Sequence, residues 1–405
     1  MNIKIKKSFL KGEITAPPSK SMAHRFLICA GLSDGESTVN NIAFSEDILA
    51  TLDCLREMGA EIGKGEGFVK IKGISPMNIT ESKKFSARES GSTLRFFIPL
   101  ALLSECEHSF TGYGRLMERP MEVYESLCKE KGLYFRQSDE KIKVKGRLTP
   151  GEFTLRGDVS SQFISGLLFA LPLCDGDSRI QLTGKTESRS YIDMTLLAMR
   201  TFGIKAEWED KNTLYIKGSQ KYSGGNFNVE GDCSNAAFLD ALNYIGSDVS
   251  VKGIAENTIQ GDRVYKKYFK LLSEGAPIID VSDCPDLAPI LMTLACILNG
   301  AVLTGTVRLR IKESDRGAAM KEELSKFGAD IEIKENEIII RKSPLHKSET
   351  TLSGHNDHRV IMSLTVISSL FGGEIRGAEA VRKSWPDFFD RLSEKGLEAK
   401  TDDNQ

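Results

Sequence analysis

Residues 55–62 read LREMGAEI, and this kind of helix ending recurs along the chain. In each copy an amphipathic helical segment stops at a glycine, and a strand-like run usually follows. The other copies are LCKEKGLYF (127–135), AMRTFGIKAE (198–207), LLSEGAPI (271–278), LSKFGADIEI (324–333) and LSEKGLEAK (392–400). Their glycines, which suit a left-handed helix end, are Gly59, Gly132, Gly203, Gly275, Gly328 and Gly396, at intervals of 73, 71, 72, 53 and 68 residues. The sequence therefore contains six repeats.

A second helix, apolar almost all round, occurs once in every repeat, and we expect it to be buried. Its copies cover residues 19–35, 90–106, 160–176, 233–248, 284–300 and 356–373. One repeat therefore consists of a buried helix, a strand, a polar loop, an amphipathic helix, a glycine and two strands. The fourth repeat is short between Gly275 and Asp286, and we expect it to lack the strand pair.

Six repeats over 405 residues predict two domains of three repeats each. We expect the first domain at residues 19–228, and the second at residues 1–18 together with 229–405. The segment KYSGGNFNVEGD (221–232) is rich in glycine and asparagine, as a hinge or crossing segment would be. The repeat does not indicate where the N-terminal strand pairs. The alternative is a single irregular α/β fold with coincidental glycines.

Charge and hydropathy exclude several classes of protein. A net charge of −2 argues against a broad nucleic-acid-binding face. The start, MNIKIKKSFLKG, lacks the apolar core of a signal peptide, and the longest apolar runs are too short to span a bilayer. The eight cysteines form no Cys-x-x-Cys pair, and we interpret them as buried free thiols in a reducing cytoplasm.

Polar residues gather at the starts of the buried helices, where unpaired N–H groups attract anions. They are Lys20-Ser21, Ser90-Gly91-Ser92, Ser160-Ser161-Gln162, Ser234-Asn235, Asp286 and Asn356-Asp357-His358-Arg359. If the repeats are pseudo-symmetric, we expect these helix ends to face one interdomain cleft that binds anions. Cations in motif positions fit such a cleft, although each could instead be a surface ion-pair partner: Lys20, Arg25, Arg115, Lys312, Arg316, Arg359 and Lys383.

Three acids accompany these cations: Asp286, Glu313 and Asp315. Each could transfer a proton or balance charge, and Asp286 could also be a plain N-cap. His355 and His358 have no third histidine or cysteine ligand nearby in the sequence, so we expect no metal site. The sequence contains no P-loop, dinucleotide fingerprint or nucleophile-elbow motif.

Nine motifs, in order and in register with the repeats, give the chain a family resemblance. They are PPSKSMAHR (17–25), ESGSTLR (89–95), TGYGRLMERP (111–120), GDVSSQF (157–163), SRSYIDMT (188–195), GDCSNAAF (231–238), IKESDR (311–316), NDHR (356–359) and RKSWPDFF (382–389). Almost end to end, the sequence resembles the EPSP synthase, or 3-phosphoshikimate 1-carboxyvinyltransferase, family. The resemblance implies a two-domain inverse α/β barrel-like fold of six βαβαββ repeats, three per domain, with the fourth shortened.

The resemblance also implies an activity, which belongs to the shikimate pathway of aromatic amino acid and chorismate biosynthesis. The family transfers the enolpyruvyl group of phosphoenolpyruvate to the 5-hydroxyl of shikimate 3-phosphate and releases phosphate. The implied catalytic residues are Asp286 as proton acceptor, Glu313 as proton donor, and Lys20. The implied contacts of shikimate 3-phosphate are Lys20, Ser21, Arg25, Ser160, Ser161, Gln162, Ser188, Tyr191, Asp286 and Lys312. The implied contacts of phosphoenolpyruvate are Lys20, Gly91, Arg115, Gln162, Arg316, Arg359 and Lys383.

By the same resemblance we expect a cytoplasmic monomer that needs no metal or organic cofactor and has no nucleic-acid or membrane partner. We also expect sensitivity to the herbicide glyphosate, for which Gly91 leaves room. Two departures affect fine contacts. Many relatives have Asn-Ala-Gly-Thr where this chain has Glu89 to Ser92, and one branch has Asn at the position of Arg308.

Two other functions remain open. The sister enolpyruvyltransferase acts on UDP-N-acetylglucosamine and typically carries a reactive cysteine in the loop that here reads TGYGRLMERP, without a cysteine. The other alternative is a non-catalytic anion-binding protein on the same scaffold. The presence of Asp286, Glu313 and Lys20 together argues against it.

Overall fold

The computed structural model describes residues 1–402 and divides the chain into two compact units. One unit, here called the split unit, combines Met1–Pro17 with the chain from Gly231 onward; the other, the continuous unit, is Pro18–Glu230. Each unit has its own hydrophobic core. Within the described residues, no helix is long and apolar enough to cross a membrane.

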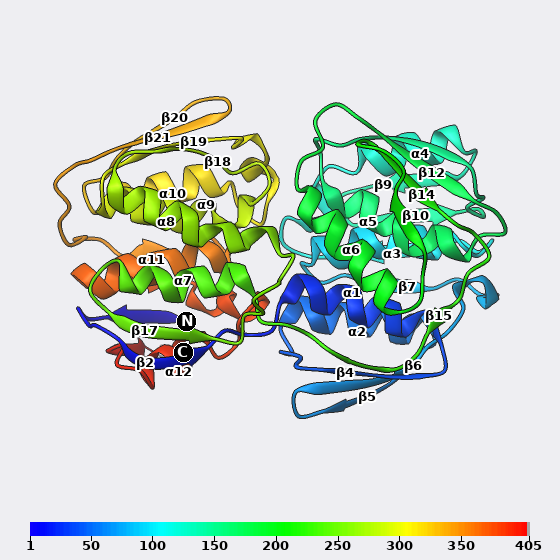
Figure 1. The fold of residues 1–405 in the computed structure, drawn as a ribbon, viewed down its shortest axis with the longest axis horizontal. Coiled ribbons are helices and arrows are strands. Elements are labelled where there is room, and N and C mark those ends of the chain that lie inside the picture. Colours follow the sequence, from blue (N-terminus) through cyan, green and yellow to red (C-terminus); the bar gives the residue numbers. More distant parts are fainter. Residues whose placement is uncertain (403–405) are drawn as a thin grey trace. The chain divides into compact units, whose positions relative to one another are not determined.

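Three four-stranded sheets of one design build the continuous unit (Figure 1). In each, a leading strand pairs parallel with a central strand, and the central strand pairs antiparallel with a hairpin. The sheets are β7 (Lys84–Ser86), β8 (His108–Thr111), β10 (Lys141–Lys145) and β9 (Tyr134–Gln137); β11 (Glu152–Arg156), β12 (Ser178–Thr183), β14 (Thr213–Ile216) and β13 (Ala206–Trp208); and β16 (Asn226–Asn228), β4 (Glu36–Asn40), β6 (Phe68–Lys72) and β5 (Glu61–Gly65). The unit also contains a separate two-stranded parallel sheet, β3 (Ser33–Asp34) with β15 (Tyr222–Ser223).

The helices of this unit are of the two kinds that the sequence predicts. The nearly all-buried ones are α1 (Lys20–Gly31), α3 (Gly91–Ala101) and α5 (Ser161–Ala170). The amphipathic ones are α2 (Glu46–Met58), α4 (Glu122–Glu130) and α6 (Arg189–Thr201), and short 3₁₀ turns are η1 (Pro76–Asn78), η2 (Leu116–Glu118) and η3 (Leu171–Leu173). A parallel pair needs a crossover, and α3 and α5 each fill one; both helices are buried, and they pack against each other.

The split unit repeats this design in one sheet, repeats it in a second sheet with β1 (Asn2–Ile5) and β24 (Ala399–Asp402) in place of a hairpin, and contains one remnant. The complete sheets are β18 (Ile278–Asp280), β19 (Ala301–Thr304), β21 (Glu337–Arg341) and β20 (Asp330–Ile333); and β22 (Leu352–Ser353), β23 (Gly373–Arg376), β1 and β24. The remnant is the parallel pair β2 (Lys11–Thr15) and β17 (Asp248–Lys252), which has no hairpin beside it. The prediction of a shortened fourth repeat is therefore confirmed.

The buried helices of the split unit are α7 (Cys233–Asn243), α9 (Ala288–Ile297) and α11 (His358–Phe371). The outer ones are α8 (Tyr265–Glu274), α10 (Arg316–Ser325) and α12 (Phe388–Ser393), with 3₁₀ turns η4 (Gly261–Val264), η5 (Pro285–Leu287), η6 (Val307–Ile311) and η7 (Ala378–Lys383). Figure 1 shows α7 and α11 beside one another, above the strands that include β2 and β17.

Two local predictions are wrong. Gly275 ends α8 with φ 174, an extended backbone and not the left-handed one; here the chain runs directly into β18 because the hairpin is missing. Cys106 lies in the loop after α3 and not on a helix, since α3 ends at Ala101. The predicted crossing segment, residues 221–232, additionally supplies β15 and β16, and β16 is the leading strand of the first repeat's sheet.

Candidate active site

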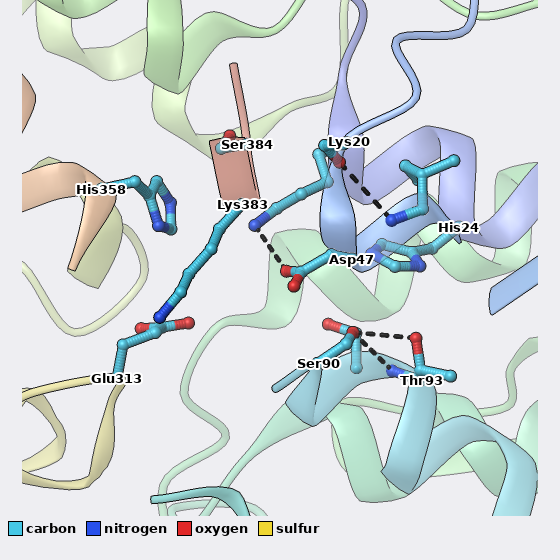
Figure 2. Close-up of polar contacts among 12 residues, drawn as sticks. Lys20, His24, Asp47, Ser90, Thr93, Glu313, His358, Lys383 and Ser384 are labelled. Atoms are coloured by element: carbon cyan, nitrogen blue, oxygen red, sulfur yellow. Dashed lines mark hydrogen bonds and ion pairs between the residues drawn. The ribbon is translucent and has the colours of Figure 1, made fainter. Parts of the chain in front are cut away.

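Lys20 begins the first cationic group, at the start of α1. Ser19 caps this helix, accepting a hydrogen bond from the N–H of Met22. The Lys20 ammonium donates to Asp47 Oδ2 at 2.9 Å, as Figure 2 shows, and both side chains are mostly buried. Ser21 is half-buried next to it. Asp47, from the first turn of α2, is a site residue that sequence reasoning missed, because an acid there looks like ordinary helix-dipole compensation.

Arg25 lies one turn further along α1 and is 3% exposed. Its guanidinium donates to the Ser21 carbonyl at 2.6 Å, the Tyr191 carbonyl at 2.9 Å and Thr195 Oγ1 at 2.8 Å. Burial lowers the pKa of Arg25 to about 10, which still leaves the group charged at neutral pH. Arg25 therefore joins α1 to α6, where the half-buried Tyr191 lies.

A second group forms where α3 and α5 begin. Gln162 Oε1 accepts from Arg95 Nη1 at 2.7 Å, and Gln162 Nε2 donates to Ser92 Oγ at 2.8 Å. A methyl group added to Gly91 would lie 2.6 Å from Arg119 Nη1, so the Arg119 guanidinium lies against this glycine. Gly91, Arg95, Arg119 and Gln162 are thus brought together at two helix N-termini.

The loop that was expected to supply Arg115 also contains Arg119, and the two side chains differ in exposure. The Arg115 side chain is 52% exposed, and its Nε lies 3.8 Å from Glu118 Oε2. Arg119 is only 9% exposed. The sequence pointed to Arg115 alone, although both arginines stand in one motif, four residues apart.

The serines predicted to bind substrate lie at the starts of α5 and α6. Ser160 caps α5 by accepting from the Gln162 N–H, and Ser161 is buried as the first residue of that helix. Ser188 is buried before α6 and has a left-handed backbone, φ 56, which is uncommon for a residue other than glycine. Such conformations are enriched at functional sites.

A buried chain of hydrogen bonds links the N-terminal parts of α1 and α3 through α2. His24 Nδ1 pairs with Thr51 Oγ1 at 2.7 Å, Thr51 with Thr93 at 2.8 Å, and Thr93 with Ser90 at 2.8 Å. Figure 2 shows Thr93 bonded to Ser90, the N-cap of α3. Burial, and secondarily Lys20 and Arg25, hold the pKa of His24 well below its ordinary value, so the imidazole is neutral. The chain links α1, α2 and α3.

In the split unit, Asp286 is surrounded by cations. Its carboxylate accepts from Arg316 Nη1 at 2.7 Å and Arg359 Nη2 at 3.0 Å, and Lys312 Nζ is 3.6 Å away. Burial raises the pKa of Asp286, but Arg359, Lys312 and Arg316 outweigh it and hold that pKa well below its usual range. Asp286 lies inside η5, whereas the N-cap position of α9 is Leu287, so the plain-cap alternative does not apply.

Arg316 connects Asp286 to two further acids. It donates to Glu313 Oε2 at 2.8 Å and to Asp357 Oδ2 at 2.9 Å. Asp315, the third predicted acid, caps α10 by accepting from the Ala318 N–H at 3.1 Å, which assigns it a structural role. Burial lowers the pKa of Lys312 to about 8, although Asp286 acts in the opposite direction.

Arg359 and Lys383 complete this cluster. Arg359 Nη2 also donates to Ser234 Oγ at 2.9 Å, at the start of α7. Lys383 Nζ donates to the Asn356 carbonyl at 2.7 Å, and in Figure 2 its side chain points toward the Glu313 carboxylate. Arg308 is buried in η6, with Nη1 3.5 Å from the Ser282 carbonyl.

Comparison with known proteins identifies the family. The sequence model of EPSP synthase (3-phosphoshikimate 1-carboxyvinyltransferase) matches residues 5–392. The chain belongs to the EPSP synthase family. Proteins named 3-phosphoshikimate 1-carboxyvinyltransferase from Clostridium kluyveri and Clostridium beijerinckii are each 39% identical to it, over 98% of this chain and 97% of theirs.

The fold comparison agrees with the EPSP synthase family. An EPSP synthase structure from Acinetobacter baumannii matches with a TM-score of 0.81 at 24% identity, covering 98% of this chain and 99% of that one. The predicted two-domain α/β fold of six repeats is thereby confirmed.

Proposed function

We propose that this member of the EPSP synthase family transfers the enolpyruvyl group of phosphoenolpyruvate to the 5-hydroxyl of shikimate 3-phosphate and releases phosphate. The observation that carries the proposal is the Asp286 cluster: a mostly buried, ionised carboxylate held by Arg316 and Arg359, with Lys312 beside it. It combines a proton acceptor with cations in a largely water-excluded place.

The excess of cations suits the charges of both substrates. Each substrate carries a phosphate and a carboxylate, so binding needs several positive groups. In the continuous unit one acid, Asp47, accompanies four cations: Lys20, Arg25, Arg95 and Arg119. Arginine suits both phosphate and carboxylate because two of its N–H groups can bind two oxygens of the anion at once. In the split unit, Arg316, Arg359, Lys312 and Lys383 exceed the acids Asp286, Glu313 and Asp357.

For shikimate 3-phosphate we assign the groups at the starts of α1, α5 and α6, together with two from the split unit. They are Lys20, Ser21, Arg25, Ser160, Ser161, Gln162, Ser188, Tyr191, Lys312 and Asp286. The helix N-termini support this assignment because their N–H groups favour a phosphate.

For phosphoenolpyruvate we assign Lys20, Gly91, Gln162, Arg316, Arg359 and Lys383, and we place Arg119 where the sequence suggested Arg115. Arg119 is buried against Gly91, whereas Arg115 faces solvent beside Glu118. Because Arg119 lies against Gly91, it is better placed than Arg115 to contact a phosphoenolpyruvate molecule that Gly91 also contacts.

In the proposed reaction Glu313 protonates the methylene carbon of phosphoenolpyruvate while Asp286 takes the proton of the 5-hydroxyl. The hydroxyl oxygen then bonds to the adjacent carbon and forms a tetrahedral intermediate. When the bond from that carbon to the phosphate oxygen breaks, phosphate leaves with the proton that Asp286 had taken, and the methyl carbon returns a proton to Glu313, which restores the double bond. Arg316 supports this sequence because it contacts both acids.

The cysteines disfavour the sister reaction on UDP-N-acetylglucosamine. Residues 111–120 contain no cysteine, and burial raises the pKa of Cys128, the next one along the chain, to about 12. A thiol of that kind is a poor nucleophile at neutral pH. All eight cysteines are free and all but Cys106 are buried, which supports a reducing cytoplasm. We further propose a monomer that needs no metal or organic cofactor.

A phosphate-release assay tests the activity. Purified protein is mixed with phosphoenolpyruvate alone, with added shikimate 3-phosphate, or with added UDP-N-acetylglucosamine. We expect release only with shikimate 3-phosphate. Release with the nucleotide sugar would favour the sister reaction, and release with neither acceptor would favour the non-catalytic alternative.

A further inference from the structure

Two consecutive residues before α11 adopt a backbone conformation that L-residues avoid. His355 has φ 47 and Asn356 has φ 51, and neither is a glycine. Asparagine tolerates the left-handed region comparatively well, but two such residues in succession need support from their surroundings. The turn that they form connects β22 to α11.

Glu323 of α10 supplies that support. Its side chain is fully buried. His355 Nε2 donates to Oε1 at 2.9 Å, and the Ser353 N–H donates to Oε2 at 2.9 Å. Lys326 Nζ donates to both oxygens, at 2.9 and 2.8 Å. The carboxylate thus holds the chain at Ser353, just before the turn, and at His355, its first residue.

The ionised state of Glu323 fits this arrangement. Burial raises the pKa of its carboxyl, but the hydrogen bonds from His355, Lys326 and Ser353 outweigh burial, and the pKa lies below its ordinary value. Hydrogen bonds to a charged acceptor are stronger than those between neutral groups, so the anchor is firm.

Residues in and next to this turn contact two cations of the candidate active site, Lys383 and Arg316. The Asn356 carbonyl accepts from Lys383 Nζ at 2.7 Å. The next residue, Asp357, caps α11 through the Arg359 N–H at 2.9 Å and accepts from Arg316 Nε at 2.9 Å. Displacing residues 355–356 would therefore move the acceptor that orients Lys383.

We propose that Glu323 and His355 form a positioning pair, which holds the His355-Asn356 turn so that the Asn356 carbonyl aims the Lys383 ammonium at the phosphoenolpyruvate group. The assignment rests on the proposed function for the identity of that ligand. Neither residue is expected to touch substrate. Their role is to fix where one substrate-binding cation lies.

A metal site is the competing explanation of the same residues. Ligand atoms of Glu322, Glu323 and His355 lie within 4.8 Å of one another, although spacing in the sequence did not predict it. The Lys326 ammonium, however, already contacts both oxygens of Glu323, and the Glu322 side chain is 60% exposed. The carboxylate's positive partner is therefore a lysine.

The test uses His355→Gly with Glu322→Gln as a matched control. Glycine adopts the left-handed backbone freely, so His355→Gly removes the imidazole anchor without adding strain. Glu322 is the neighbouring exposed acid, 4.0 Å from the same ring nitrogen. We expect the KM for phosphoenolpyruvate to rise about tenfold in His355→Gly, the cost of a charge-assisted hydrogen bond, with the KM for shikimate 3-phosphate unchanged. Glu322→Gln should behave as wild type in both.

A second measurement does not depend on turnover. Lys383 is 8% exposed, and its rate of acylation by an amine-reactive reagent can be followed by peptide mass spectrometry. We expect several-fold faster labelling of Lys383 in His355→Gly and in Glu323→Gln, but not in Glu322→Gln.

Each outcome bears on one claim. A wild type that releases no phosphate contradicts the proposed function, while the labelling rates still test the positioning pair. Wild-type KM values and wild-type labelling in His355→Gly overturn the pair, even if the variant melts at a lower temperature, because a merely stabilising role would do no more. Loss of Lys383 protection in wild type after metal chelation would show that a metal, not Lys326, holds the carboxylate.

Discussion

Arg316 contacts three carboxylates with three different nitrogens, and its side chain is 2% exposed. The planar fork of a guanidinium allows this, whereas a lysine ammonium would not reach all three acids in fixed directions. Asp286 and Glu313 are therefore held at defined places relative to one another. At the scale of single residues, the proposed proton acceptor and proton donor share one buried cation.

The role of Asp286 can be tested with Asp286→Asn. The amide keeps the shape of the side chain but cannot accept a proton, so we expect kcat to fall by about 10²–10⁴-fold. Calorimetry should still detect binding of shikimate 3-phosphate. A variant that retains most of its kcat would show that Asp286 is not the proton acceptor.

Lys312 predicts a pH dependence of substrate binding. Its pKa is lowered by burial to about 8, so in the ligand-free protein it is a cation below that pH and neutral above it. Affinity for shikimate 3-phosphate should therefore decrease as the pH rises through about 8. Lys312→Arg, which stays charged, should bind with little change over the same range. Calorimetric titrations between neutral and alkaline pH decide this, and an equal decrease in both proteins would rule out Lys312 as the cause.

Gly91 predicts an effect on inhibition. A methyl group there would come within 2.6 Å of Arg119 Nη1, the movable end of a side chain, so Gly91→Ala should displace the guanidinium instead of disrupting α3. We expect a glyphosate-sensitive wild type, and a variant that loses about 1–3 kcal/mol of glyphosate binding together with some affinity for phosphoenolpyruvate. Inhibition curves measure both effects. Equal sensitivity of the two proteins, or an insensitive wild type, would contradict this account.

At the scale of elements, the glycines that end the amphipathic helices are not equivalent. Gly132 follows α4 with φ 68, whereas Gly275 follows α8 with φ 174. A methyl group would meet nothing within 4 Å at either position. The two sites therefore differ in backbone conformation and not in available space.

This difference makes a matched pair of substitutions informative. Gly132→Ala should reduce the free energy of unfolding by about 1 kcal/mol, because alanine is strained in the left-handed region. Gly275→Ala should be neutral or slightly stabilising. Urea unfolding of the two variants measures the difference, and equal effects would contradict the assignment of backbone conformations.

The same glycines explain how far the sequence could predict the elements. Helix, glycine and strand pair are local patterns, so the six repeats could be read directly. The partners of β1, β2 and β16 could not, because each pairs with a strand far away in the sequence. In the candidate site, helix starts were predictable from their polar residues. Asp47 and Arg119 were not, since their importance depends on contacts with Lys20 and Gly91.

At the scale of the whole molecule, both units carry groups that we propose to bind substrate. Lys20 and Arg119 belong to the continuous unit, and Asp286, Arg359 and Lys383 to the split unit. Membership of the EPSP synthase family supports treating these groups as parts of one reaction. A merely anion-binding protein would need the cations but not the pair of acids that Arg316 holds.

The most direct test of that reaction is nuclear magnetic resonance of the complete mixture of protein, shikimate 3-phosphate and phosphoenolpyruvate. We expect both substrates to disappear in equal amounts, while phosphate and a new enolpyruvyl ether of shikimate 3-phosphate appear in the same amounts, and we expect Asp286→Asn to slow all four changes by the same factor as kcat. Phosphate that appears without the ether, with shikimate 3-phosphate left intact, would contradict enolpyruvyl transfer.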